Sequence, residues 1–144
     1  MKYAVFADAN VIMDGLLQRS DMGLDALEII ELAENNEITL FLSSSNLINV
    51  IYFLQKAAKI NSEIILTVKN LLSFTTIISP GNSTVIDALD ANFNDIEDGI
   101  QYYTALQIKE IDYFITSNIK DFKKASTQLP VVTPRQFLKL YKSK

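Results

Sequence analysis

Short apolar runs alternate along this chain with longer segments in which apolar residues recur at helical spacing. The short runs predict buried strands at residues 3–7, 39–42, 75–79, 113–116 and 131–132. The segments between them predict helices, the longest at residues 95–109. Because parallel neighbouring strands need crossover connections, this alternation favours a three-layer α/β/α sandwich with a mostly parallel sheet of about five strands.

Polar residues mark the starts of several predicted helices. Ser20 or Asp21 is expected to cap the helix that follows, and one of the serines at 43–45 the next helix. Thr133 followed by Pro134 predicts the start of the last helix, since proline is favoured at the first helical position. The apolar residues expected to face the core within the helices include Leu24, Leu27, Ile30, Ile65, Val68, Leu71, Leu72 and Tyr103.

The composition limits the chemistry that is open to the protein. A chain of 144 residues with 49% hydrophobic residues is long enough for one domain with a proper core, spanning residues 1–144. There is no cysteine and no histidine, which excludes disulfides, thiolate or imidazole metal ligands and Ser-His catalytic triads. Any metal must therefore be held by oxygen atoms, and Mg²⁺ or Mn²⁺ are the natural candidates.

Charge and hydropathy also bear on location and partners. The apolar runs are no longer than strands, and the N-terminus lacks the basic region of a signal peptide, so no membrane span is expected and a cytoplasmic location is predicted. The net charge of -4 argues against strong non-specific binding to nucleic acid. A local basic patch or a bound metal can still recruit phosphate.

Acidic residues gather where predicted strands end and where one helix begins. Asp8 ends the first apolar run, at the place where open α/β sheets carry ligand-facing groups, although it is equally suited to cap the next helix. Asp95 and Asp98 open the long helix, where the helix dipole alone also favours acids. Asp121 follows the fourth strand, where a simple turn is the alternative. Together these positions predict one converging acidic site.

Three segments resemble motifs of the PIN-domain family, metal-dependent nucleases that include the toxins of bacterial toxin–antitoxin pairs. They are residues 8–14 (DANVIMD), residues 95–102 (DIEDGIQY) and residues 116–122 (TSNIKDF). Val132-Thr133-Pro134 with Phe137-Leu138 is also similar to the family's closing segment. The resemblance covers essentially the whole chain, and the order and spacing of the motifs are more specific than any one of them.

The resemblance implies a role for each matching residue. Asp8, Asp98 and Asp121 would be catalytic and would bind Mg²⁺ or Mn²⁺ together with Asp95. The residues that would support them are Asn10, Thr116 and Asn118. Clustered carboxylates raise one another's pKa unless a cation neutralises them, and a bound divalent cation polarises a phosphodiester and acidifies water.

One position departs from the family pattern. The family usually places a glutamate in the helix after the second strand, and Asn49 stands there within residues 43–52 (SSSNLINVIY). An amide offers a neutral oxygen in place of a charged one, so metal affinity is expected to fall. Weak, Mn²⁺-favouring or absent catalysis is the consequence to be tested.

The function implied by the resemblance is metal-dependent endonucleolytic cleavage of RNA, most readily of single-stranded or loop RNA, by the toxin of a toxin–antitoxin pair. Its partners would then be RNA and an antitoxin protein. The alternatives are a catalytically weak or inactive PIN-like module that binds RNA or a protein, and an activity on DNA. The oligomeric state stays open, with a homodimer among the choices. Of the adjacent Tyr102 and Tyr103, one is expected in the core, and the other could stack on a base if it borders the cleft.

Overall fold

Five short strands form one parallel sheet at the centre of the protein. The computed structural model describes residues 2–18, 21–57, 59–123, 125 and 128–143. In these residues the strands are β1 (Ala4–Ala7), β2 (Thr39–Ser43), β3 (Thr75–Ile78), β4 (Tyr113–Ile115) and β5 (Val131–Val132). Their order in the sheet is β3-β2-β1-β4-β5, and every neighbouring pair is parallel. The predicted sheet is thereby confirmed.

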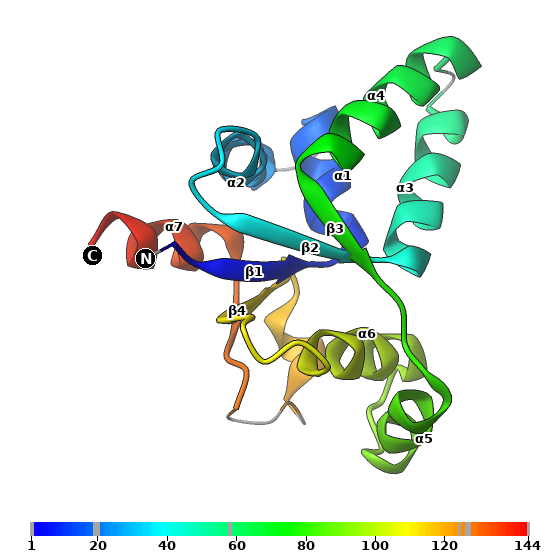
Figure 1. Ribbon diagram of the computed structural model, residues 1–144, viewed down its shortest axis with the longest axis vertical. Helices are drawn as coiled ribbons and strands as arrows, with labels where there is room; N and C mark the ends of the chain where they lie inside the picture. Colours follow the sequence, from blue (N-terminus) through cyan, green and yellow to red (C-terminus); the bar gives the residue numbers. More distant parts are fainter. Residues whose placement is uncertain (1, 19–20, 58, 124, 126–127, 144) are drawn as a thin grey trace.

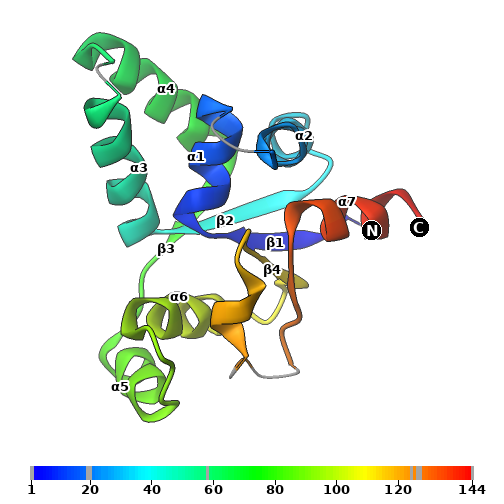
Figure 2. The ribbon, with the colours of Figure 1, turned by 180° about the vertical axis from the view of Figure 1, so that it is seen from behind.

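Helices cover both faces of this sheet, which explains why its central strands are apolar throughout (Figures 1 and 2). The helices are α1 (Ala9–Leu17), α2 (Gly23–Glu34), α3 (Ser44–Lys56), α4 (Asn61–Ser73), α5 (Asn82–Asp90), α6 (Ile96–Leu106) and α7 (Pro134–Lys142), with a short 3₁₀ helix η1 (Ile119–Phe122). Helices α1, α2 and α7 pack on one face around Val5 and Ala7. Helix α6 and η1 pack on the other face around Phe6 and Phe114. The predicted α/β/α sandwich is confirmed.

Helices α3 and α4 form a hairpin that extends beyond the sheet (Figure 1). Each helix of this hairpin buries only a narrow stripe of its surface. In α4 this stripe contains Ile64 and Leu71. The predicted inward positions Ile65 and Leu72 are wrong, since both side chains are exposed. Sequence spacing could not choose between neighbouring apolar residues of one helix.

Side-chain caps begin the helices that carry candidate site residues. Asp8 caps α1, Ser43 caps α3 and Asp95 caps α6, each through a side-chain oxygen that accepts a backbone N–H. Thr133 forms a full capping box with Gln136 at the start of α7. These caps place the first turns of α1, α3 and α6 at the same edge of the sheet, where the parallel strands end.

The start of α2 differs from the prediction. Met22 precedes the helix, and no side chain caps it, so Asp21 does not cap α2, and Ser20 lies outside the described residues. Gly23 instead meets the end of α1 closely, since a Cβ at this position would lie 3.0 Å from the carbonyl oxygen of Asp14. Leu24, the next residue, is 74% exposed rather than buried, so its predicted place in the core is wrong.

None of the helices in the described ranges combines the length and the apolarity needed to cross a membrane.

Candidate functional site

A cavity of about 290 Å³ opens at the carboxyl edge of the sheet, beside the ends of β1 and β2. Residues of α1, α3 and α6 surround it, together with Asp8 between β1 and α1. Its lining consists of Asp8, Ala9, Asn10, Met13, Asn46, Asn49, Tyr52, Phe53, Glu97, Asp98 and Gln101. The structure therefore brings Asp8, Asp98, Asn10 and Asn49, all predicted from the sequence, to one open site. This edge is where parallel α/β sheets hold their ligands.

Asp8 is held by two hydrogen bonds at the rim of this cavity. Its Oδ1 accepts the backbone N–H of Val11 at 3.1 Å, and its Oδ2 accepts the hydroxyl of the buried Thr116 at 2.6 Å. Burial raises the pKa of Asp8 above its ordinary value, and the hydrogen bonds from Thr116 and Val11 only partly oppose this shift. Asp8 is thus both a helix cap and a cavity residue, so the two readings of the sequence are compatible.

Asp98 carries the clearest electrostatic signature of the site. Burial, the larger cause, and charge repulsion together raise its pKa from 3.8 to about 6. The repelling carboxylates are those of Asp95, Asp121, Asp8 and Glu97. Among the described residues, no lysine or arginine forms an ion pair with Asp98 or Asp8.

The TSNIKDF segment links Asp8 to Asp121 by a chain of hydrogen bonds. Thr116 donates to Asp8, and its hydroxyl oxygen accepts the backbone N–H of Asn118 at 3.2 Å. The Asn118 amide in turn donates to Asp121 Oδ2 at 2.6 Å. Thr116 therefore holds the Asp8 carboxylate, and Asn118 holds the Asp121 carboxylate. Asp121 does not line the cavity itself but acts on Asp98 through its charge.

Asp95 has a structural role at the same edge. Its Oδ1 accepts the backbone N–H of Asp98 at 3.2 Å, which is the cap of α6. Asp95 is exposed and lies outside the cavity lining. It nevertheless raises the pKa of Asp98, so it belongs to the electrostatic environment of the site.

Asn49, the position that departs from the family pattern, faces the acids. It is half-buried on the α3 wall of the cavity, and its Nδ2 donates to Glu97 Oε1 across the cavity at 3.4 Å. This contact joins α3 to the first turn of α6. A glutamate at position 49 would instead meet Glu97 as a second negative charge.

The donor set suits a hard divalent cation, although the acids are not drawn together into a finished site. Within the part of the chain that the structure describes, no group of three acidic side chains forms a ready-made metal site. Asp8 and Asp121 are each occupied by the hydrogen bonds given above. Carboxylate and amide oxygens are nevertheless the ligands that Mg²⁺ and Mn²⁺ take, and the raised pKa of Asp98 shows the repulsion that such a cation would relieve.

A buried glutamine that sequence reasoning missed ties the two walls of the cavity together. Gln101 is only 5% exposed; its Oε1 accepts the Ser43 hydroxyl at 2.6 Å, and its Nε2 donates to the Ser45 hydroxyl at 2.5 Å. The Asn46 amide adds a bond of 3.0 Å to the carbonyl oxygen of Ala7, at the end of β1. The only signal in the sequence was a polar residue between two apolar ones, Ile100 and Tyr102.

Gln101→Ala is expected to lower the free energy of unfolding by about 1–3 kcal/mol, because it removes the buried hydrogen bonds of Gln101 with the Ser43 and Ser45 hydroxyls. Chemical denaturation measures this loss. Gln107→Ala is the matched control, since Gln107 directly follows α6, is exposed, and makes its hydrogen bonds with Thr84 and with the backbone of Ser79 and Gly81. We expect the control to lose less than about 1 kcal/mol. Equal losses in the two variants would show that Gln101 does not tie α6 to α3.

Comparison with known proteins places this geometry in a family. The sequence model of the PIN domain matches residues 4–120. The protein named Ribonuclease VapC1 from Aquifex aeolicus (strain VF5) is 32% identical over 138 residues, which covers 92% of each chain.

Solved structures share the fold at lower identity. VapBC2 from Rickettsia felis, bound to a DNA fragment from its promoter, aligns with a TM-score of 0.65 and 20% identity over 90% of this chain and 98% of that chain. A toxin–antitoxin complex from Klebsiella pneumoniae aligns with a TM-score of 0.62 and 22% identity over 91% of this chain and 97% of that chain. With its acidic cavity at the carboxyl edge of a five-stranded parallel sheet, the chain belongs to the PIN-domain family.

Proposed function

We propose that this protein is a metal-dependent endoribonuclease that acts as the toxin of a toxin–antitoxin pair. The observation that carries the proposal is the meeting of Asp8 and Asp98 across one open cavity, with a carboxylate at Asp98 whose pKa is raised to about 6. The similarity to a protein named as a ribonuclease supports RNA as the substrate class. The solved relatives that are toxin–antitoxin complexes support an antitoxin protein as partner.

The residues present fit a role in holding Mg²⁺ or Mn²⁺. Asp8, Asp98 and Asp121 would supply the charged oxygens, with Asp95 beside them. When bound, the cation would polarise the scissile phosphodiester and lower the pKa of water. Thr116 and Asn118 orient two of the carboxylates, and Asn10 and Asn49 add neutral amide oxygens at the cavity wall.

A cleavage assay on a mixed RNA pool tests the proposal. The purified protein is incubated with Mn²⁺, with Mg²⁺ or with EDTA, and a DNA pool of the same lengths is run beside the RNA. We expect RNA fragments with metal and none with EDTA. If neither metal produces more cleavage than EDTA, the nuclease proposal fails, and the chain is better described as a PIN-like module that binds RNA or a protein. Cleavage of the DNA pool alone would redirect the proposal to DNA.

Asn49 is the observation that favours the alternative of a PIN-like module with weak or no catalysis. It places an amide where the family usually has a charged ligand. Asn49→Glu is expected to tighten Mn²⁺ binding on the order of tenfold, since affinity rises with ligand charge. It is also expected to destabilise the metal-free protein, because the new carboxylate would lie beside Glu97.

Isothermal titration with Mn²⁺ and denaturation in EDTA measure the two effects. Asn49→Gln, which changes length without adding charge, is the matched control. If Asn49→Glu and Asn49→Gln behave alike in both measurements, Asn49 does not act on the metal site, and the correspondence of this position with the family glutamate has to be abandoned.

A further inference from the structure

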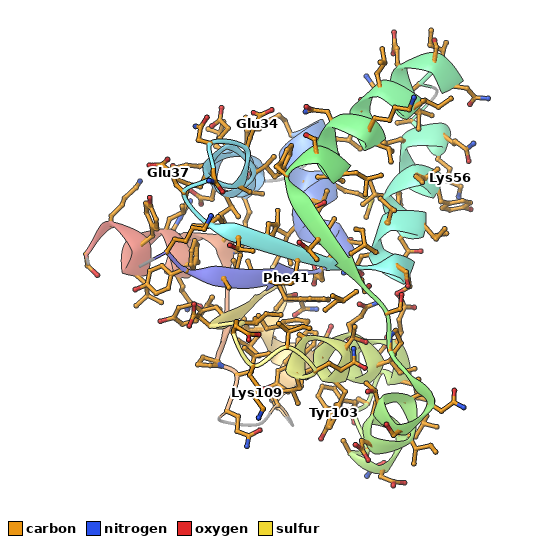
Figure 3. All side chains as sticks on the ribbon, viewed as in Figure 1. Glu34, Glu37, Phe41, Lys56, Tyr103 and Lys109 are labelled. Carbon is orange, nitrogen blue, oxygen red and sulfur yellow. The ribbon has the colours of Figure 1, made fainter. Side chains whose placement is uncertain are left out.

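One face of α3 carries a polar, then two aromatic, then a basic side chain, in order of increasing distance from the acidic cavity. Asn49, Tyr52, Phe53 and Lys56 follow the spacing i, i+3, i+4 and i+7, which places them on one side of a helix. Asn49, Tyr52 and Phe53 line the acidic cavity. Lys56 lies one turn further along the hairpin, with its Nζ 5.0 Å from the centre of the Tyr52 ring (Figure 3).

These aromatic side chains are not needed for the hydrophobic core. Helix α3 packs its buried face through Val50 and Leu54, whereas Tyr52 is 51% exposed and Phe53 is 37% exposed. The two rings meet edge to face with their centres 5.8 Å apart. Each ring therefore restrains the other, and together they form a fixed aromatic surface at the mouth of the cavity.

An unpaired base with its backbone phosphate matches this surface. Bases stack on aromatic rings with little regard to sequence, and lysine side chains pair with phosphates. One helical turn, about 5 Å, separates Asn49 from the two rings, and about 10 Å separates it from Lys56. The acids and the rings thus follow one another along the helix, and the Lys56 ammonium group lies over the Tyr52 ring, from which it has to move toward a phosphate when a base stacks there. A base within a duplex stays in its stack and is not free to use such a surface.

We propose that Tyr52 and Phe53 form a stacking site for one unpaired base of single-stranded RNA, and that Lys56 binds a phosphate next to it. This inference rests on the proposed function, because it assigns the chemistry that brings RNA to the acidic cavity. It also assigns base stacking to Tyr52 and Phe53 instead of Tyr102 or Tyr103, which were the candidates from the sequence. Tyr102 is fully buried and donates to the carbonyl oxygen of Leu129, while Tyr103 borders a separate pocket beside α5 (Figure 3).

Fluorescence anisotropy with a labelled twelve-nucleotide oligouridine tests the stacking site. The assay is run in EDTA, so that metal-dependent cleavage does not consume the probe. We expect Tyr52→Leu to weaken binding roughly five- to hundredfold, the range for one base stacked on one aromatic ring. Tyr52→Trp keeps a flat aromatic face and should bind as the wild type does. Tyr103→Leu is the matched control at the other candidate tyrosine and should leave binding unchanged.

A second probe separates stacking from a change in fold or charge. A ribose-phosphate oligomer of the same length without bases should bind weakly, and equally to wild type and Tyr52→Leu. Lys56→Gln should lower the slope of log affinity against log salt by about 0.7, the value for one phosphate of a single strand. Far-ultraviolet circular dichroism checks that every variant is folded.

Three results would overturn the stacking site. They are oligouridine binding unchanged by Tyr52→Leu, an equal effect of that substitution on the baseless oligomer, and no measurable binding of oligouridine by the wild type. Base-dependent binding without metal-dependent cleavage would instead defeat the nuclease proposal and leave the stacking site standing.

Discussion

Asp98→Asn is expected to lower metal-dependent RNA cleavage on the order of a hundredfold or more, the scale of loss when one electrostatically acting group leaves an active site. The substitution removes a negative charge from the cavity and changes the volume of the side chain little. The backbone N–H of residue 98 still donates to Asp95, so the cap of α6 is kept. Asp8→Asn should act in the same way, because it also removes a negative charge from the cavity, and its single amide oxygen can still cap α1 through the Val11 N–H while the Thr116 hydroxyl loses its acceptor.

Initial cleavage rates in saturating Mn²⁺ measure this loss. The matched control is Asp90→Asn, the same substitution at an exposed aspartate that ends α5. We expect the control to cleave at the wild-type rate. Wild-type cleavage by the folded Asp98→Asn variant would remove Asp98 from the catalytic site and with it the observation on which the proposed function rests.

Local patterns were enough to find the residues at the edge of the sheet. Each apolar run ends within one residue of the end of its strand, and parallel strands end at one edge, so Asp8 and the segment that contains Thr116 could be assigned to the same edge. Residue type likewise predicted the cap at Thr133 and placed the cap of α3 among the serines at 43–45, where the structure assigns it to Ser43.

Contacts between distant helices could not be found in this way. Gln101 meets Ser43 and Ser45 only because α6 lies against the end of β2, and nothing in the sequence near residue 101 specifies that neighbour. The exposure of the aromatic residues of α3 could not be predicted from the sequence for the same reason. Tyr52 and Phe53 follow helical spacing as core residues do, and they are identified as surface residues only once Val50 and Leu54 are seen to take the buried face.

The metal-free protein is expected to lose stability as the pH rises from about 4 to above 6. The pKa of Asp98 is 3.8 in its ordinary state and about 6 in the folded protein, so the folded state holds the proton more tightly between these values. The resulting stabilisation is fully present below pH 3.8 and is lost as the pH passes through about 6. The raised pKa of Asp8 acts in the same direction. Asp98→Asn should therefore show a flatter decline than the wild type.

A divalent cation should reverse this loss at neutral pH, because it neutralises the same carboxylates that protons neutralise at low pH. At a hundredfold excess over its Kd, Mn²⁺ is expected to stabilise the wild type by about 2.7 kcal/mol, which raises the Tm by about 8 °C for a chain of this size. Thermal unfolding at pH 5 and pH 7.5, in EDTA and in Mn²⁺, measures both effects. Parallel pH curves for wild type and Asp98→Asn would mean that neither burial nor the neighbouring carboxylates raise the pKa of Asp98 in the folded protein. An unmoved Tm in millimolar Mn²⁺ would mean that the cavity, with Asn49 in place of a charged ligand, does not bind metal usefully.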